Sequence, residues 1–172
     1  MRIEKLKELL TGGEGINVEF KQSRNKLNKD VFESVCAFLN RNGGHLFLGV
    51  EDKGGIIGIE PGAVDKLKKD FVTSMNNAQK ISPTFYLTIE DVEIEGETIL
   101  YIFIPESSQV HRCNGRIYDR NEDGDIDITD NTNLVSAMYM RKQGTYAENR
   151  IFPYAEISEL KSDLFIKARK LA

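Results

Sequence analysis

Three acidic side chains in the N-terminal third have the types and spacing of a divalent-metal site. Glu14 and Glu19 stand five residues apart where a short alternating segment begins, and Asp52 follows a nearly continuous apolar run at residues 45–50. If these segments are neighbouring strands, the carboxylates converge at one edge of a sheet. Converging carboxylates suit Mg²⁺ or Mn²⁺, which activate water in phosphodiester hydrolysis. On spacing alone, there is a simpler alternative in which Glu14 caps a turn, Glu19 pairs with a neighbouring lysine, and Asp52 is an ordinary turn aspartate.

A second group of residues is basic. Four cations lie within nine residues that contain no acid, and a fifth follows one helix later: Lys21, Arg24, Lys26, Lys29 and Arg41. Cations interleaved with amide and hydroxyl donors are typical of a surface that contacts nucleic-acid phosphates. A solvated lysine-rich loop is the alternative that the residues leave open.

The segment 119–130 follows the twelve-residue calcium loop position for position. The predicted ligands are the side chains of Asp119, Asn121 and Asp123, the backbone carbonyl of Asp125, Asp127 directly or through water, and Asp130. Gly124 stands at the one position that needs a sharp turn. Six acids and one base in this segment repel one another unless a cation or solvent compensates. We therefore predict a structural Ca²⁺ site, with an acidic hairpin tip as the alternative.

The hydrophobic pattern indicates the elements that must position these residues. It predicts helices over 3–10, 28–40 (with Asn28 as N-cap), 62–78, 131–142 and about 156–171, and strands over 17–22, 45–50, 56–59, 85–95, 98–104 and 110–118. Residues 137–141 also fit a strand. No repeat or low-complexity linker divides the chain. We predict one α+β domain over residues 1–172, with helices packed on an antiparallel-rich mixed sheet.

Composition excludes several classes of protein. The 172 residues are 40% hydrophobic and 29% charged, as in soluble globular proteins, and no apolar run approaches the ~18 residues of a membrane helix. No signal peptide opens the chain, so we expect a cytoplasmic protein. The net charge is −4, but most of the acidity lies in residues 119–130, so it does not argue against nucleic acid. No P-loop, GxSxG, HExxH, GxGxxG or CxxC motif is present.

Residues 14–59 also resemble a known family. The pattern is Glu14-x4-Glu19-Phe20-Lys21, then Ala37-Phe38-Leu39-Asn40 with Gly43-Gly44, then Leu46-Phe47-Leu48-Gly49-Val50 with Asp52, Gly54 and Gly58. It is similar to the Schlafen-type AlbA-like domain, and the similarity continues more weakly over 60–118. The resemblance implies a DNA-binding domain of a bacterial transcriptional regulator. Such domains are often followed by an ATPase-like or winged-helix module, which this chain lacks.

The same resemblance implies an alternative activity. Vertebrate Schlafen proteins cleave tRNA or rRNA through a carboxylate triad, and Glu14, Glu19 and Asp52 stand at the matching positions. Those enzymes pair two lobes around the RNA, so a single lobe would have to form a homodimer, and their zinc-site pattern is missing here.

Three functions therefore stay open at this stage. The first is a DNA- or RNA-binding module, the second a divalent-metal-dependent ribonuclease, and the third a calcium-stabilised protein-interaction domain. Salt-dependent binding without cleavage would favour the first, and Mg²⁺- or Mn²⁺-dependent cleavage the second. A lack of affinity for nucleic acid would leave the third.

Overall fold

The computed structural model describes residues 3–143 of the chain. The elements are α1 (Ile3–Gly12), β1 (Val18–Lys21), α2 (Val31–Asn40), β2 (Gly44–Leu48), η1 (Pro61–Ala63), α3 (Val64–Met75), β3 (Ile81–Ser82), β4 (Ile89–Ile94), β5 (Glu97–Ile104), β6 (Arg112–Cys113), β7 (Tyr118–Asn121), β8 (Gly124–Asp127) and α4 (Thr132–Gln143). The combination of helices with largely antiparallel strands gives the α+β class that the sequence predicted.

Four strands form the main sheet, in the order β1-β2-β5-β4. β1 and β2 are parallel and are joined through α2, whereas β5 is antiparallel to both of its neighbours. β2 lies inside the sheet, and its residues Leu46, Phe47 and Leu48 have no solvent exposure. A strand that is covered on both faces carries a continuous apolar run, which explains the pattern at residues 45–50.

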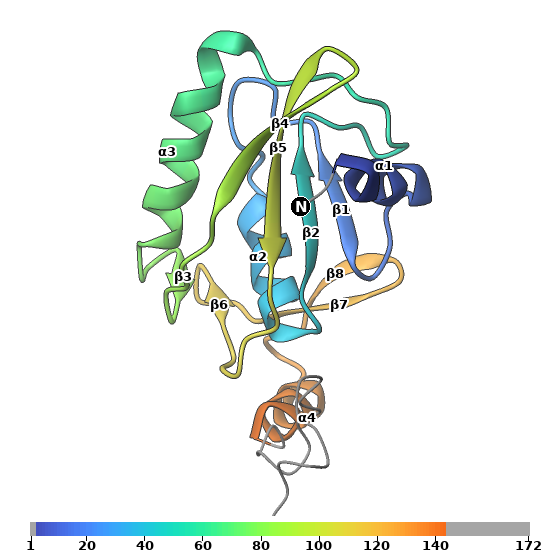
Figure 1. Cartoon of the computed structure of the whole chain (residues 1–172). Coiled ribbons are helices and arrows are strands. Elements are labelled where there is room, and N and C mark those ends of the chain that lie inside the picture. The colour runs from blue at the N-terminus through green and yellow to red at the C-terminus, as the bar shows by residue number, and fades with distance from the viewer. Residues whose placement is uncertain (1–2, 144–172) are drawn as a thin grey trace, which may run out of the picture.

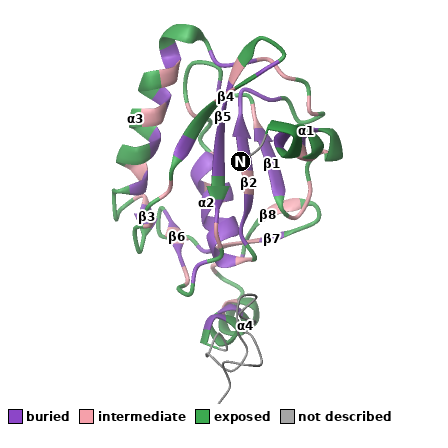
Figure 2. Cartoon of the chain, viewed as in Figure 1, coloured by how far each residue is buried: buried purple, intermediate pink, exposed green. Residues whose placement is uncertain are grey.

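Helices cover both faces of this sheet (Figure 1). α2 and α3 pack against one face, where the core includes Leu46, Leu100 and Ile102. α1 packs against the other face, where the core includes Phe47 and Tyr101. Figure 2 shows burial concentrated in α2 and the central strands, whereas α1, α3 and α4 expose much of their surface. α2 therefore lies at the centre of the domain.

Most of the predicted elements are confirmed, including the helix after the acidic segment, which is α4. The helix predicted at about 156–171 lies outside the described residues. Residues 56–59 were predicted as a strand, which is wrong: only Ile56 forms a bridge, to Val50. Positive φ at Gly49 and Gly58 turns the chain out of strand geometry. The strand predicted over 110–118 is reduced to β6 and the start of β7.

The predicted N-cap of α2 is also wrong. Asn28 lies before the helix, and the N-cap position belongs to Asp30. The side chain of Asn28 instead accepts hydrogen bonds from the backbone N–H and hydroxyl of Ser23. None of the described helices is long and apolar enough to cross a membrane.

Candidate functional site

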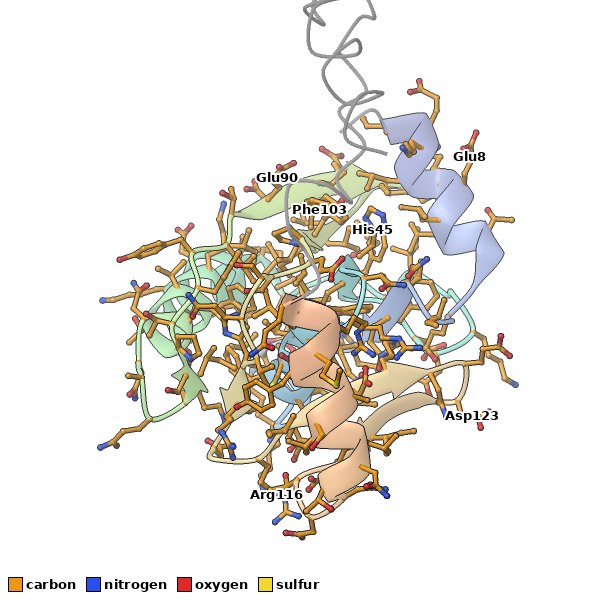
Figure 3. The ribbon with its side chains drawn as sticks, turned by 90° about the horizontal axis from the view of Figure 1, so that it is seen from below. Glu8, His45, Glu90, Phe103, Arg116 and Asp123 are labelled. Carbon is orange, nitrogen blue, oxygen red and sulfur yellow. The ribbon has the colours of Figure 1, made fainter. Side chains whose placement is uncertain are left out.

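Glu14 and Glu19 line one cavity of about 340 Å³ between β1, the first turn of α2 and the β7–β8 hairpin. Seven acidic and two basic side chains line it: Glu14, Glu19, Asp30, Glu33, Glu122, Asp123, Asp125, Lys21 and Arg120. We call it the acidic cavity. Figure 3 shows Asp123 at the outer end of the hairpin and Arg116 nearer to α4. The cavity therefore joins residues that lie more than a hundred positions apart in the chain.

The guanidinium of Arg120 is the buried centre of this site, with 1% of its side chain exposed. It pairs with a carboxylate oxygen of Glu19 and with Oδ1 of Asp125 at 2.6 Å. It also donates to the backbone carbonyls of Gly15 at 2.9 Å and Val18 at 3.1 Å. These two carbonyls also accept the backbone N–H of each other's residue across the Gly15–Val18 bridge, so Arg120 ties the hairpin to the turn that leads into β1.

The hairpin register explains why Arg120 reaches this position. Arg120 and Asp125 are direct cross-strand partners, so their side chains share one face of the hairpin. The ring of Phe38 lies 4.6 Å from the guanidinium carbon, which adds a cation–π contact. The sequence reasoning missed Arg120, although it is the single base in a run of six acids.

Lys21 is held by two carboxylates of the same cavity. Its Nζ lies 2.5 Å from Glu19 and 2.7 Å from Asp30. Burial lowers the pKa of Lys21, but the hydrogen bonds to Asp30 and Glu19 outweigh it, so the pKa is raised above its ordinary value. Glu19 consequently has one oxygen on Lys21 and the other on Arg120.

Glu14 and Asp52 have different surroundings. The Glu14 carboxylate accepts the N–H of Phe20 at 2.9 Å. Burial raises the pKa of Glu14, the Phe20 N–H partly opposes this, and the charges of Glu19 and Asp52 raise it further. Asp52 itself is exposed in the turn after β2 and is not among the residues that line the cavity. The structure thus brings Glu14 and Glu19 together and leaves Asp52 outside the cavity.

As they are placed, these carboxylates do not fit a bound Mg²⁺ or Mn²⁺. Both oxygens of Glu19 already have cationic partners. Within residues 3–143, no three histidine, cysteine, aspartate or glutamate side chains are arranged to hold a metal ion. The metal site at Glu14, Glu19 and Asp52 stays a prediction.

The predicted calcium ligands lie on a β-hairpin. Strand alternation places Asp119 and Asn121 on one face and Asp125 and Asp127 on the other. The side chain of Asn121 accepts the N–H of Asp123 at 2.9 Å, which closes the hairpin turn.

Arginines pair with most of these carboxylates. Asp119 contacts Arg41 and Arg141, each at 3.4 Å, and Arg116 contacts both Asp127 and Asp130. With the oxygens on two faces and held by arginines, the segment as placed does not form a calcium cage. Ca²⁺ binding stays a prediction.

The predicted basic residues divide into two sets. Arg24, Lys26 and Lys29 are exposed on the segment 24–29 between β1 and α2, which we call the basic loop, and they have no carboxylate partner within residues 3–143. Lys21 and Arg41 instead lie in the ion pairs described above. The first set is therefore available to an anionic ligand, whereas carboxylates of the protein neutralise the second set.

The basic loop is fixed at its ends by hydrogen bonds. The N–H and the hydroxyl of Ser23 donate to Asn28 Oδ1 at 3.0 and 2.9 Å, and the N–H of Asn28 donates to the Ser23 hydroxyl at 3.2 Å. Ser23 is 3% exposed and has a φ of 37°. Between these residues, Asn25 donates to Glu60 at 3.2 Å. The loop is therefore restrained while its cations point to solvent.

Comparisons with known proteins agree with this fold. The family model described as "Schlafen, AlbA_2" matches residues 14–129, and no curated protein sequence matches the chain. The N-terminal domain of an ATP-dependent DNA helicase RecG-related protein from Nitrosomonas europaea is 29% identical, with a TM-score of 0.47, over 62% of this chain and 74% of that one. The DIP2311 protein from Corynebacterium diphtheriae is 18% identical, with a TM-score of 0.59, over 99% of this chain and 38% of that one. The second likeness shows the fold alone.

Proposed function

The chain belongs to the Schlafen, AlbA_2 family, and from this we propose that it is a nucleic-acid-binding domain whose basic loop contacts backbone phosphates. The observation that supports the proposal most is the basic loop itself. Its cations Arg24, Lys26 and Lys29 are exposed and project from a backbone that Ser23 and Asn28 hold in place. A restrained loop loses little conformational entropy on binding.

The physical basis of binding is the release of counterions from the phosphates. Each ammonium or guanidinium that reaches a phosphate displaces condensed cations, so affinity falls as the salt concentration rises. Such contacts position the protein on the backbone and carry no base sequence information. Lys21 and Arg41 are left out of the proposed contacts because carboxylates hold them.

The proposal extends to the biological setting implied by the resemblance. We place this domain in a bacterial transcriptional regulator, with a further module supplied by other parts of the protein. The chain spans 38% of the length of the Corynebacterium diphtheriae protein. A twofold homodimer, which is the commonest kind of symmetric oligomer, would present two copies of the basic loop.

A metal-dependent ribonuclease is the second candidate. The observation that favours it is the shared cavity of Glu14 and Glu19. The pairing of Glu19 with Arg120 and Lys21 weighs against it, because a metal would have to displace a buried cation. Binding without cleavage is therefore our first choice.

One experiment separates the candidates. Fluorescently labelled duplex DNA and structured RNA are incubated with the protein, in Mn²⁺ and in EDTA, and both retention and cleavage are read. The variant Arg24→Ala/Lys26→Ala/Lys29→Ala should bind at least about tenfold more weakly at ~0.1 M salt. The matched control Lys5→Ala/Lys7→Ala/Lys53→Ala removes the same charge from exposed positions on and near α1 and should bind like wild type.

The outcomes that count against the proposal are specific. Equal binding by the two triple variants would show that the basic loop is not the contact surface. Cleavage in Mn²⁺ that is lost in EDTA and in Glu19→Gln would establish the nuclease instead.

A further inference from the structure

A hollow of about 440 Å³ adjoins the basic loop on the side of α3. Lys26 and Lys29 of the basic loop and Phe32 of α2 line one part of it. Asp70 and Ser74 of α3 and Lys80, the residue before β3, line the rest. Figure 1 shows α3 and β3 at the left of the molecule and α2 in the centre, behind the strands of the main sheet. Three lysines and one aspartate make the hollow net positive. We call it the lysine hollow.

Lys80 is held in place on this surface. Its Nζ lies 5.1 Å from the centroid of the Phe32 ring, and that ring stacks on Phe71 with centroids 5.7 Å apart. The backbone of Lys80 is fixed too: its N–H donates to Asn77 at 2.8 Å, and its carbonyl accepts the N–H of Asn114 at 2.9 Å. The ammonium is thereby positioned by core residues rather than by a carboxylate.

The first turn of α2 separates this hollow from the acidic cavity. Lys29 and Phe32 face the hollow, whereas Asp30 and Glu33 line the cavity. An anion is attracted to one side of the turn and repelled from the other, because several charges of one sign gather on each side. A phosphate backbone that reaches the basic loop is therefore directed toward α3 and Lys80.

We infer that the lysine hollow binds one backbone phosphate of the nucleic acid, and that Lys80 is a phosphate-binding residue together with Lys26 and Lys29. The inference rests on the proposed function, and it adds a contact from a segment far from the basic loop in sequence. The hydroxyl of Ser74 supplies a neutral donor, and among the described residues that line the hollow Asp70 is the one carboxylate, which opposes the phosphate.

Two substitutions of opposite sign test the inference by fluorescence anisotropy with labelled duplex DNA and structured RNA. Lys80→Gln should weaken binding about three- to tenfold and make affinity about threefold less sensitive to an increase in salt from ~50 to ~200 mM. Asp70→Asn removes the opposing charge and should tighten binding. Matched controls are Lys7→Gln on α1 and Asp65→Asn on α3, which is outside the hollow; both should bind like wild type.

A second readout does not depend on the variants. Lysine acetylation followed by mass spectrometry should show Lys80 protected by bound DNA, with Lys7 modified equally in its presence and absence. If Lys80→Gln and Asp70→Asn bind like their controls while the basic-loop variant loses binding, the lysine hollow is not a phosphate site and the proposed function stands. If the basic-loop variant also binds normally, the proposed function itself is wrong.

Discussion

Arg120 is the residue on which the acidic cavity depends. It is 2% exposed and contacts two carboxylates and two backbone carbonyls at once. The sequence left Glu19 either to a divalent metal, which suits converging carboxylates, or to a pair with a neighbouring lysine. The structure pairs Glu19 with Lys21, two residues away, and with Arg120, about a hundred residues later. The lysine partner was foreseeable from spacing, whereas only the fold could show the arginine.

Replacing Arg120 should therefore be costly. Arg120→Ala leaves Glu19 and Asp125 without their shared partner, and loss of one member of a buried ion pair typically destabilises by about 3–5 kcal/mol. Urea unfolding measures this. Arg112→Ala is the control, because Arg112 makes an exposed bond to Gly115, and it should change stability by less than about 0.5 kcal/mol. A loss below about 1 kcal/mol in Arg120→Ala would show that the buried pair is dispensable.

His111 should make stability depend on pH. Its Nδ1 lies 2.8 Å from the carbonyl of Pro83, which only accepts, so Nδ1 carries the proton and Nε2 accepts from the Ser107 hydroxyl at 2.7 Å. Burial, partly offset by the Pro83 bond and aided by the charge of Lys142, lowers the pKa of His111 below 6.5. As the pH falls, His111 is therefore protonated in the unfolded chain at a higher pH than in the folded protein.

Because the unfolded chain binds this proton more tightly, a fall in pH lowers the free energy of unfolding. The contribution of His111 to stability is complete above pH ~6.5 and is lost as the pH falls through the lowered folded-state pKa. Urea unfolding between pH 7 and pH 5 should show a shallower loss in His111→Gln than in wild type. Identical slopes would mean that His111 does not titrate differently on folding. His45, whose pKa burial also lowers, accounts for a remaining slope in the variant.

At the scale of elements, the turn between α2 and β2 explains the first glycine of the Gly43-Gly44 pair in the family pattern. Gly43 has a φ of +74°, and a Cβ there would lie 2.5 Å from the carbonyl oxygen of Ile104. Gly43→Ala should destabilise by at least about 2 kcal/mol, from the left-handed backbone and the clash together. Gly62→Ala is the control in the same urea unfolding assay, since a Cβ there meets nothing within 4 Å. Equal stabilities would contradict this account of the turn.

The acidic segment shows why a sequence pattern can fit two elements. Gly124 has a φ of +115°, and a sharp turn at this position serves a hairpin as well as a calcium loop. Spacing could not reveal the partners Arg41, Arg116 and Arg141, because each lies outside the twelve residues.

A metal titration decides between the two descriptions of this segment. If the predicted calcium site is present, the thermal midpoint of metal-stripped protein should be higher in millimolar Ca²⁺ than in EDTA, and if the arginine pairs hold the carboxylates instead, the two midpoints should be equal. A calcium-dependent rise that Asp119→Ala abolishes would establish the predicted calcium site. It would also show that Asp119 leaves Arg41 to bind the ion.

At the scale of the whole molecule, the sequence predicted the α+β fold and the position of β2 because apolar periodicity reports burial directly. The sequence did not predict how the charged side chains are distributed over the surface. Asp30 and Glu33 are neighbours of Lys29 in sequence, yet they face a different side of α2 from it. Lys80 lines the same hollow as Lys26 and Lys29 and lies over the Phe32 ring, which stacks on Phe71, and none of this could be foreseen from its distance along the sequence.

The most direct test of the central claim is the salt dependence of nucleic-acid binding. The slope of log affinity against log salt is measured for wild type, the basic-loop variant and the Lys5/Lys7/Lys53 control. Each lost phosphate contact reduces the slope by about 0.7–0.9, so the basic-loop variant should lose roughly 2 to 2.7 in slope on every sequence tested. The control should keep the wild-type slope. An unchanged slope in the basic-loop variant would contradict the claim that Arg24, Lys26 and Lys29 contact phosphates.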